Sequence, residues 1–466
     1  MRDYDTYTGT INYKEIDFTF IFDKKKLKLI PPKEQKHEVD MWFMEKIENG
    51  VYTLGNPIYV DEIIYGIANE TGKKIVLIPA HKSIGRINST LIIDIEFYII
   101  NKYDREKIDR IAIKGPEITH IFPTTIALNK FDWEMNGKIG VSTKSFDETT
   151  TAKESFCMGD KELLIYFGIS VSSTYKTGES PISLNSTMFI EFFPTDDYKF
   201  IVNLIKIAKQ FIQYLCYRKN VIFSRIEISA PTSKGLHETF AVLHEAHENN
   251  IEEIYPIEKE RLIKYDYLKG HLGSILNDIV NQNIYLEHIP ESYEIGRHIN
   301  AGRFVMITAA FEWEFKRNYP VGIEKSLKTR EAEDNISNII DKLIKENTGK
   351  SKEILKFLKK LIRSDNLASR IIEYGKHYGN ISDIFGNHLY SINDEKLNYK
   401  EMGKRLSDQR NHFAHGDIDK EFIGLSLLDL VYLEYIIYIM QLKFYGIEDD
   451  EIKHAINDLF RCNIAL

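Results

Sequence analysis

The chain has 466 residues, of which 43% are hydrophobic and 28% are charged, and its formal net charge is -8 at pH 7. This length exceeds one ordinary hydrophobic core and predicts two to three domains, while the composition excludes a disordered or fibrous protein. The negative charge excludes a protein that coats nucleic acid through its overall field, so any RNA-binding site has to be local.

The cysteines and the amino terminus indicate the compartment. Cys157, Cys216 and Cys462 lie far apart in the sequence and have no paired spacing. This pattern predicts a reducing compartment, with neither a disulfide framework nor a cysteine-based metal site. The first residues, MRDYDTYTGTINYKEID, are polar and lack the apolar core of a signal peptide. We therefore expect a cytoplasmic protein.

From the amino terminus to about residue 195, short runs rich in Ile, Val, Tyr, Phe and Thr alternate with turn residues, a pattern typical of strands. Seven or more such runs predict an antiparallel sandwich or barrel. The predicted strands are Phe18–Phe22, Ile58–Tyr65, Lys74–Ile78, Thr90–Ile100, Ile111–Ile121, Leu163–Ser173 and Thr187–Phe193.

The hydrophobic period then changes. Asp197–Tyr217 has apolar residues at steps of three and four, which predicts an amphipathic helix that closes the first domain. Val221–Ile228 is one more predicted strand, and Thr232–Asn250 mixes strand and helix signals. We place the domain boundary in this mixed region, so that residues 1–245 form a β-rich domain for sensing or for substrate positioning.

Residues 246–466 carry mostly helical periodicity and predict an all-helical bundle, which makes the chain an α+β protein of several domains. Polar joins at Asn347–Gly349 and Asn380–Asn387 are its predicted loops. The predicted helices are Glu258–Gln282, Ser292–Tyr319, Ala332–Glu346, Lys352–Gly375, Lys400–Ala414, Phe422–Tyr445 and Asp449–Phe460.

The segment Phe422–Tyr445 is nearly continuous apolar sequence and is long enough to span a bilayer. However, Asp429, Glu434, Gln441 and Lys443 recur along it, and each would be costly in hydrocarbon. We therefore expect a helix that is buried on most sides, within the bundle or at a dimer interface, and no membrane association.

A polar cluster precedes this helix. Arg410, Asn411, His412 and His415 lie within six positions, near the end of a predicted helix. Arg and Asn are seldom fully buried unless they are paired, so such a cluster in an apolar helical region indicates a function. Arginine, a polar residue, three further positions and histidine resemble the R-x4-6-H signature of HEPN domains, the helical bundles of many prokaryotic ribonucleases.

Two further features extend the resemblance. Ala310-Phe311-Glu312 resembles an Ala-apolar-Glu element that HEPN domains often carry on an earlier helix, and Leu425–Ile456 resembles the way such domains end. With the strand-rich front, the chain resembles the ApeA family of anti-phage HEPN nucleases, which implies a HEPN core at about residues 292–460. Glu312 is a candidate to pair with Arg410 or to tune the histidine, and a surface acid is the alternative.

The motif suits RNA cleavage without a metal or another cofactor, in which the ribose 2′-hydroxyl attacks the phosphate. Imidazole titrates near neutral pH, so the motif histidine His415 suits proton transfer, and His412 is its neighbouring competitor. The guanidinium of Arg410 stays charged and matches phosphate oxygens, and so suits charge stabilisation. Asn411 lies four residues before His415 and shares its helix face, where its amide could orient the imidazole or the phosphate.

One helix supplies few catalytic groups. The resemblance implies a homodimer in which Arg410, Asn411 and His415 of both copies form one composite site. It also implies tRNA anticodon loops as the substrate, products with a 2′,3′-cyclic phosphate and a 5′-hydroxyl, and a phage-derived trigger. A non-catalytic HEPN scaffold for RNA or protein, or a toxin–antitoxin component, is the alternative function.

Other charged groups have a structural alternative. Lys352, Lys356, Lys359 and Arg363 line one predicted helix face and could contact an RNA backbone, but a solvated face is the usual role of such a stripe. The histidines and acids between His237 and His247 have no metal-protease spacing, and we expect no metal site there.

Overall fold

The computed structural model describes residues 4–46, 52–133, 139–175, 177–178, 180, 182–246, 260–362, 365–414 and 422–466. Two compact units divide the chain: the first comprises Met1–Glu258 and Lys264–Asn281, and the second comprises Lys259–Ile263 and Gln282–Leu466. The expected domain boundary after residue 245 borders on residues 247–259, which are outside the described ranges.

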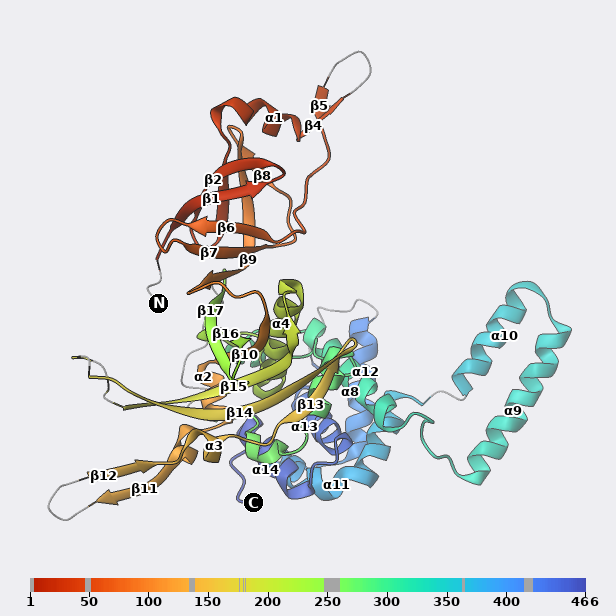
Figure 1. The fold of residues 1–466 in the computed structure, drawn as a ribbon. Helices are drawn as coiled ribbons and strands as arrows, with labels where there is room; N and C mark the ends of the chain where they lie inside the picture. Colours follow the sequence, from red (N-terminus) through yellow and green to blue (C-terminus); the bar gives the residue numbers. More distant parts are fainter. Residues whose placement is uncertain are drawn as a thin grey trace. The chain divides into compact units, whose positions relative to one another are not determined.

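Six antiparallel strands of the first unit close into a barrel (Figure 1). Their order is β9-β3-β2-β1-β6-β7, and β7 pairs again with β9. Every second side chain points inward because successive residues of a strand face opposite sides, and Tyr, Phe, Ile and Leu fill the interior. The barrel strands are β1 (Tyr7–Tyr13), β2 (Ile16–Phe22), β3 (Lys26–Ile30), β6 (Ile64–Ala68), β7 (Lys73–Pro79) and β9 (Thr90–Asn101).

A close approach of two barrel strands requires one glycine. On Gly9 of β1, a Cβ atom would lie only 1.9 Å from the carbonyl oxygen of Ile67 in β6. Next to it, Thr8 donates from its backbone N–H to both carboxylate oxygens of Glu70, at 2.9 and 3.0 Å. These contacts hold β1 against the end of β6.

The sheet continues from β9 through β17, β16, β10, β15 and β14 to β13. The long strand β9 serves both parts, because its residues 91–94 pair with β3 while residues 97–101 pair with β17. The barrel and the second part of the sheet therefore share one hydrogen-bonded ladder. The strands of this part are β10 (Ile108–Lys114), β13 (Glu154–Met158), β14 (Lys161–Ser173), β15 (Ile182–Thr195), β16 (Arg225–Pro231) and β17 (His237–Glu245).

Helix α4 (Tyr198–Cys216) packs against the sheet, with Phe200 on Phe192 of β15. It begins at Asp197, whose carboxylate accepts from the N–H groups of Lys199 and Phe200 and caps the helix. The shorter elements of the unit are α1 (Lys36–Met41), β4 (Met44–Lys46), β5 (Tyr52–Leu54), β8 (Gly85–Ile87), α2 (Pro116–Ile121), β11 (Leu128–Trp133), β12 (Ile139–Thr143), α3 (Phe146–Thr149) and α6 (Leu272–Val280).

The second unit is helical, and α13 (Ser426–Phe444) lies at its centre, packed against α8, α11, α12 and α14. The burial of α13 on nearly all sides confirms the predicted buried helix. An α+β protein with a β-rich front and a helical carboxyl-terminal part is likewise confirmed. The other helices are α7 (Tyr293–Gly296), α8 (Ala301–Asn318), α9 (Leu327–Glu346), α10 (Gly349–Ile362), α11 (Leu367–Ser391), α12 (Tyr399–Ala414) and α14 (Asp449–Phe460).

The predicted strands agree with the observed ones where apolar runs are long, but some of the predicted strand ends are wrong. The prediction of one strand over Ile111–Ile121 is wrong in its second half, because β10 ends at Lys114 and Pro116 begins α2. Proline cannot donate to a sheet ladder, and its fixed φ suits the first helical turn. Of the predicted strand Ile58–Tyr65, only the last two residues belong to β6.

Four predictions in the helical region need correction. Ser292–Tyr319 is two helices, because α7 ends at Gly296 and Asn300 caps the start of α8. Within Glu258–Gln282, the described part is regular only at a short 3₁₀ turn and at α6, which are separated by Gly270 with a φ of 81°. Lys352–Gly375 is not one helix, because α11 restarts with Asn366 as its amino-terminal cap. Asn380–Asn387, predicted as a loop, lies inside α11. There Asn380 donates to Asp449 of α14 and Asp383 accepts from Tyr399 of α12, and such tertiary contacts outweigh the weak helix propensity of these polar residues.

Candidate functional site

The candidate site lies on α12, the helix that carries most of the predicted motif. Asn398 caps this helix, because its side-chain oxygen Oδ1 accepts from the backbone N–H groups of Lys400 and Glu401. One face of α12 is buried through residues at steps of four, three and four: Met402, Leu406, Gln409 and Phe413. Arg410 and His412 are half-buried and Asn411 is exposed, so the polar end of the motif faces away from the buried stripe.

Arg410 contacts the acidic residue that the sequence suggested. Its Nη2 atom lies 2.7 Å from Oε2 of Glu312 and its Nη1 atom lies 3.4 Å from Oε1, which joins α12 to α8 across 98 residues of sequence. The Glu312 side chain is 19% exposed. Of the alternatives for Glu312, the structure therefore has the ion pair with Arg410 and not an isolated surface acid.

A second arginine shares this carboxylate. Nη1 of Arg370, in the first turns of α11, lies 3.1 Å from Oε1 of Glu312, and its side chain is only 14% exposed. Two guanidinium groups and one carboxylate leave a local charge of plus one. Arg370 is not among the predicted site residues, because its only local signal is an arginine next to the buried Ile371 on an amphipathic helix.

The end of α12 is anchored on both sides of the motif. Phe413 packs edge-to-face on Phe304 and Phe422, with ring centroids 5.4 and 5.5 Å away. The side-chain oxygen of buried Gln409 accepts from the backbone N–H of Ile423 at 2.7 Å. These contacts join the end of α12, before residue 415, to Phe422 and Ile423, which follow residue 421. The predicted proton-transfer residue His415 lies outside the described residues.

A buried ion pair fixes α12 on α13. Nε and Nη2 of Arg405 donate to the two oxygens of Asp429 at 2.7 and 2.8 Å, and Tyr390 of α11 also donates to this carboxylate. The hydrogen bond to Asp429 raises the pKa of Arg405, and burial with the adjacent carboxylate raises the pKa of Tyr390. Three helices therefore meet at one carboxylate, and the motif helix has a defined position in the bundle.

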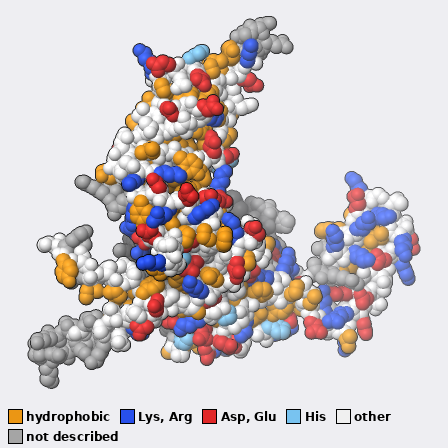
Figure 2. Space-filling model, viewed as in Figure 1, with side chains coloured by type: hydrophobic (Ala, Val, Ile, Leu, Met, Phe, Trp, Pro, Cys, Tyr) orange, Lys and Arg blue, Asp and Glu red, His pale blue; other side chains and the backbone are white. Residues whose placement is uncertain are grey.

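The basic stripe belongs to a separate hairpin. Lys352, Lys356 and Lys359 lie on α10, which packs extensively only on α9 among the described elements. Lys359 forms an ion pair with Asp341 of α9, so this lysine stabilises the hairpin. Arg363 lies outside the described residues. On the face drawn in Figure 2, Lys and Arg side chains are interspersed with Asp and Glu.

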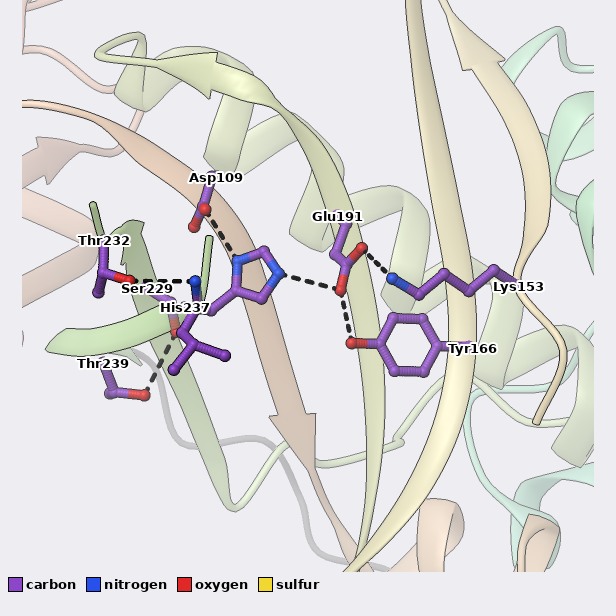
Figure 3. A network of polar contacts seen from close by, with 9 residues as sticks. Asp109, Lys153, Tyr166, Glu191, Ser229, Thr232, His237 and Thr239 are labelled. Atoms are coloured by element: carbon purple, nitrogen blue, oxygen red, sulfur yellow. Dashed lines mark hydrogen bonds and ion pairs between the residues drawn. The ribbon is translucent and has the colours of Figure 1, made fainter. Parts of the chain in front are cut away.

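His237, from the predicted histidine-rich segment, lies between two carboxylates in the first unit (Figure 3). Its Nδ1 is 2.8 Å from Oδ2 of Asp109, and its Nε2 is 3.2 Å from Oε1 of Glu191. Burial raises the pKa of Asp109. For Glu191, burial opposes ionisation, but hydrogen bonds from Lys153 and Tyr166 outweigh it and lower the pKa.

This network connects the strands β10, β14, β15 and β17 through side chains and is a structural feature of the sheet. Within the described ranges, no group of three or more His, Cys, Asp or Glu side chains is arranged to hold a metal ion. His244 is stacked on Tyr98, with ring centroids 4.8 Å apart. His247, the third histidine of this segment, is not among the described residues.

Comparison with protein-family models, with curated proteins and with solved structures found no match to this chain. None of the helices in the described ranges combines the length and the apolar character needed to cross a membrane.

Proposed function

We propose that this chain is a metal-independent endoribonuclease of the HEPN type, similar to the ApeA family, that acts in the cytoplasm in anti-phage defence. Its proposed substrate is RNA, with tRNA anticodon loops as the preferred target. Such loops expose single-stranded bases, which proteins recognise better than the edges of paired bases.

One observation carries the proposal: Arg410 of the motif contacts Glu312 at 2.7 Å. Two elements that resembled HEPN features independently, the Ala-apolar-Glu element and the Arg-to-His motif, lie far apart in sequence and meet in the fold. The contact holds the arginine in the last turn of α12, immediately before the exposed Asn411. Four described residues, 411–414, separate it from the segment with His415.

The proposed reaction divides between these side chains. His415 takes part in proton transfer, either removing the 2′-hydroxyl proton or protonating the leaving 5′-oxygen. The 2′-oxygen then bonds to phosphorus while the bond to the 5′-oxygen breaks, which gives a 2′,3′-cyclic phosphate and a 5′-hydroxyl. Arg410 stabilises the charge on the phosphate oxygens, and Asn411 orients the phosphate or the imidazole.

The reaction needs one group to remove a proton and another to supply one. A single motif offers one histidine for these two tasks, if His412 has no catalytic part. We therefore propose a homodimer in which Arg410, Asn411 and His415 of both copies face a shared phosphate. Mass measurement in solution at micromolar concentration tests this part, and a monomer would contradict the composite site.

The test is cleavage of total tRNA by the full chain in EDTA, with and without lysate from phage-infected cells as a source of trigger. Wild type should release fragments with 5′-hydroxyl ends, and His415→Ala and Arg410→Ala should lose at least about a hundredfold in rate. His388→Ala, which alters an exposed histidine on α11, should cut like wild type.

Intact tRNA in both conditions, or equal cleavage by His415→Ala, would overturn the enzyme assignment. A protein that binds RNA or a partner protein without cleaving RNA would then fit the alternative of a non-catalytic scaffold. A toxin–antitoxin component would instead require a neutralising partner.

A further inference from the structure

The shared carboxylate of Glu312 is unlike the other arginine–carboxylate pairs around the central helices. Each of those pairs joins one guanidinium to one carboxylate. They are Arg303–Glu434, Arg317–Glu314 and Arg405–Asp429. Glu312 instead has Arg370 and Arg410, so one guanidinium charge is not neutralised within this group.

The second arginine is not needed to neutralise Glu312, because Arg410 already contacts both of its carboxylate oxygens. Bringing another guanidinium onto the same carboxylate costs charge repulsion and side-chain entropy. Arg370 is nevertheless held in place, since its guanidinium also lies over the ring of Phe315, 5.7 Å from the centroid. Such a fixed excess positive charge is suited to an anionic ligand.

We propose that Arg370 and Arg410 form a two-arginine site for an RNA backbone phosphate, in which Glu312 positions both guanidinium groups. Each guanidinium has five N–H donors. Glu312 receives two contacts from Arg410 and one from Arg370, so most donors of the pair are directed elsewhere. Planar guanidinium forks match phosphate oxygens. Because Glu312 already supplies a carboxylate to both arginines, we infer that the ligand is a phosphate.

The location supports the same ligand. The Arg410 side chain is 34% exposed, and the exposed Asn411 follows it directly on α12. A phosphate reached by Arg410 is therefore accessible from solvent, while Arg370 approaches it from α11. The inference rests on the proposed function, because it takes the ligand to be the RNA that the motif would cleave, and it assigns Arg370 a binding role that the motif does not include.

The test measures RNA binding separately from cleavage. The probe is a fluorescein-labelled tRNA anticodon stem-loop in which every ribose carries a 2′-O-methyl group, so that no 2′-hydroxyl is available for attack. Binding of the full chain is followed by fluorescence anisotropy over a series of salt concentrations. The variants are Arg370→Gln, Arg370→Lys and Arg317→Gln, and cleavage of unmodified tRNA is assayed in parallel.

Arg370→Gln should bind the probe about tenfold or more weakly than wild type, because it loses charge-assisted hydrogen bonds to a phosphate. The slope of log affinity against log salt should also become shallower by about 0.7, the value for one contact to a single-stranded phosphate. Arg370→Lys keeps the charge but loses the fork, so the salt slope should stay while affinity falls.

Arg317→Gln is the matched control. It removes another largely buried arginine of the same bundle, which contacts Glu314 on α8, and its side chain is 11% exposed. If Arg370→Gln loses binding only because the bundle is weakened, Arg317→Gln should lower the affinity by the same factor. It should also make the salt slope as shallow as that of Arg370→Gln. Melting temperatures of all variants, measured alongside, identify any variant that is unfolded at the assay temperature.

The outcomes separate this inference from the proposed function. If wild type cleaves tRNA but Arg370→Gln binds the probe with wild-type affinity and salt slope, the two-arginine site is wrong and the nuclease stands. If no protein cleaves RNA and Arg370→Gln still shows the weaker, less salt-dependent binding, the site stands and the nuclease is wrong. No measurable binding of the probe by wild type would overturn the site.

Discussion

Replacing Glu312 by glutamine tests whether the shared carboxylate holds the bundle together. The substitution keeps the size of the side chain but replaces one acceptor oxygen by an NH₂ group that faces a guanidinium. The carboxylate contacts Arg410 at 2.7 and 3.4 Å and Arg370 at 3.1 Å. A hydrogen bond to a charged group contributes about 1.5–3 kcal/mol, and partial exposure places this loss near the lower end.

We therefore expect Glu312→Gln to lower the free energy of unfolding by about 2 kcal/mol. For a unit of this size, that loss lowers the melting temperature by about 4–8 °C. Differential scanning calorimetry of the full chain measures this shift in melting temperature, from the unfolding transition of the helical unit. Glu324→Gln is the control, because Glu324 is 89% exposed and lies 3.4 Å from Arg330, and we expect no measurable change.

A double-mutant cycle with Arg370→Gln isolates the interaction itself. Residues that share one ion-pair network should have a coupling energy of about 0.5–3 kcal/mol. Equal melting temperatures of Glu312→Gln and Glu324→Gln, together with additive effects of Glu312→Gln and Arg370→Gln, would refute the view that Glu312 holds the two guanidinium groups.

Two further outcomes follow from burial. Asp429→Asn should destabilise the helical unit by about 3 kcal/mol, because Asp429 is fully buried and its carboxylate is the ion-pair partner of Arg405. An unchanged urea midpoint of unfolding would contradict this expectation. Burial raises the pKa of Cys216 from 9.0 to about 12, so unfolding releases a proton in this range and stability should fall as pH rises from about 9. Cys216→Ala should flatten this alkaline decrease in urea midpoints, and at pH 8 a thiol reagent should label exposed Cys157 but not native Cys216.

Local sequence pattern was sufficient for much of the fold. Strands such as β9 and β14 and the helix α14 were predicted close to their observed bounds, because long apolar runs of period two or 3.6 bury one face in almost any tertiary context. The strand β1 was missed, since its outward positions are Thr, Thr and Asn and its inward aromatic and aliphatic residues are interrupted by Gly9. Pairing with β2 and β6 stabilises it instead.

The residues of the candidate site also fall into two groups, those that the sequence predicted and one that only the tertiary structure identified. Arg410 and Asn411 were identified because a motif is a local spacing, and Glu312 because a second local element suggested it. Arg370 belongs to no motif, and an arginine beside an apolar helix position does not by itself indicate a binding residue. Only the packing of α11 beside α8 brings its guanidinium to the carboxylate of Glu312. Likewise, only the packing of α10 on α9 shows that Lys359 is paired with Asp341.

By itself, the sequence predicted a strand-rich front followed by helices, the buried faces of long elements such as β9 and α14, and the local motif around Arg410. It did so because each of these depends on neighbours within a few turns of chain. The tertiary structure alone decided that the sheet closes into a barrel and that two arginines share one acid. Both depend on contacts between distant segments, whose geometry is determined by the packing of the whole core rather than by any local period.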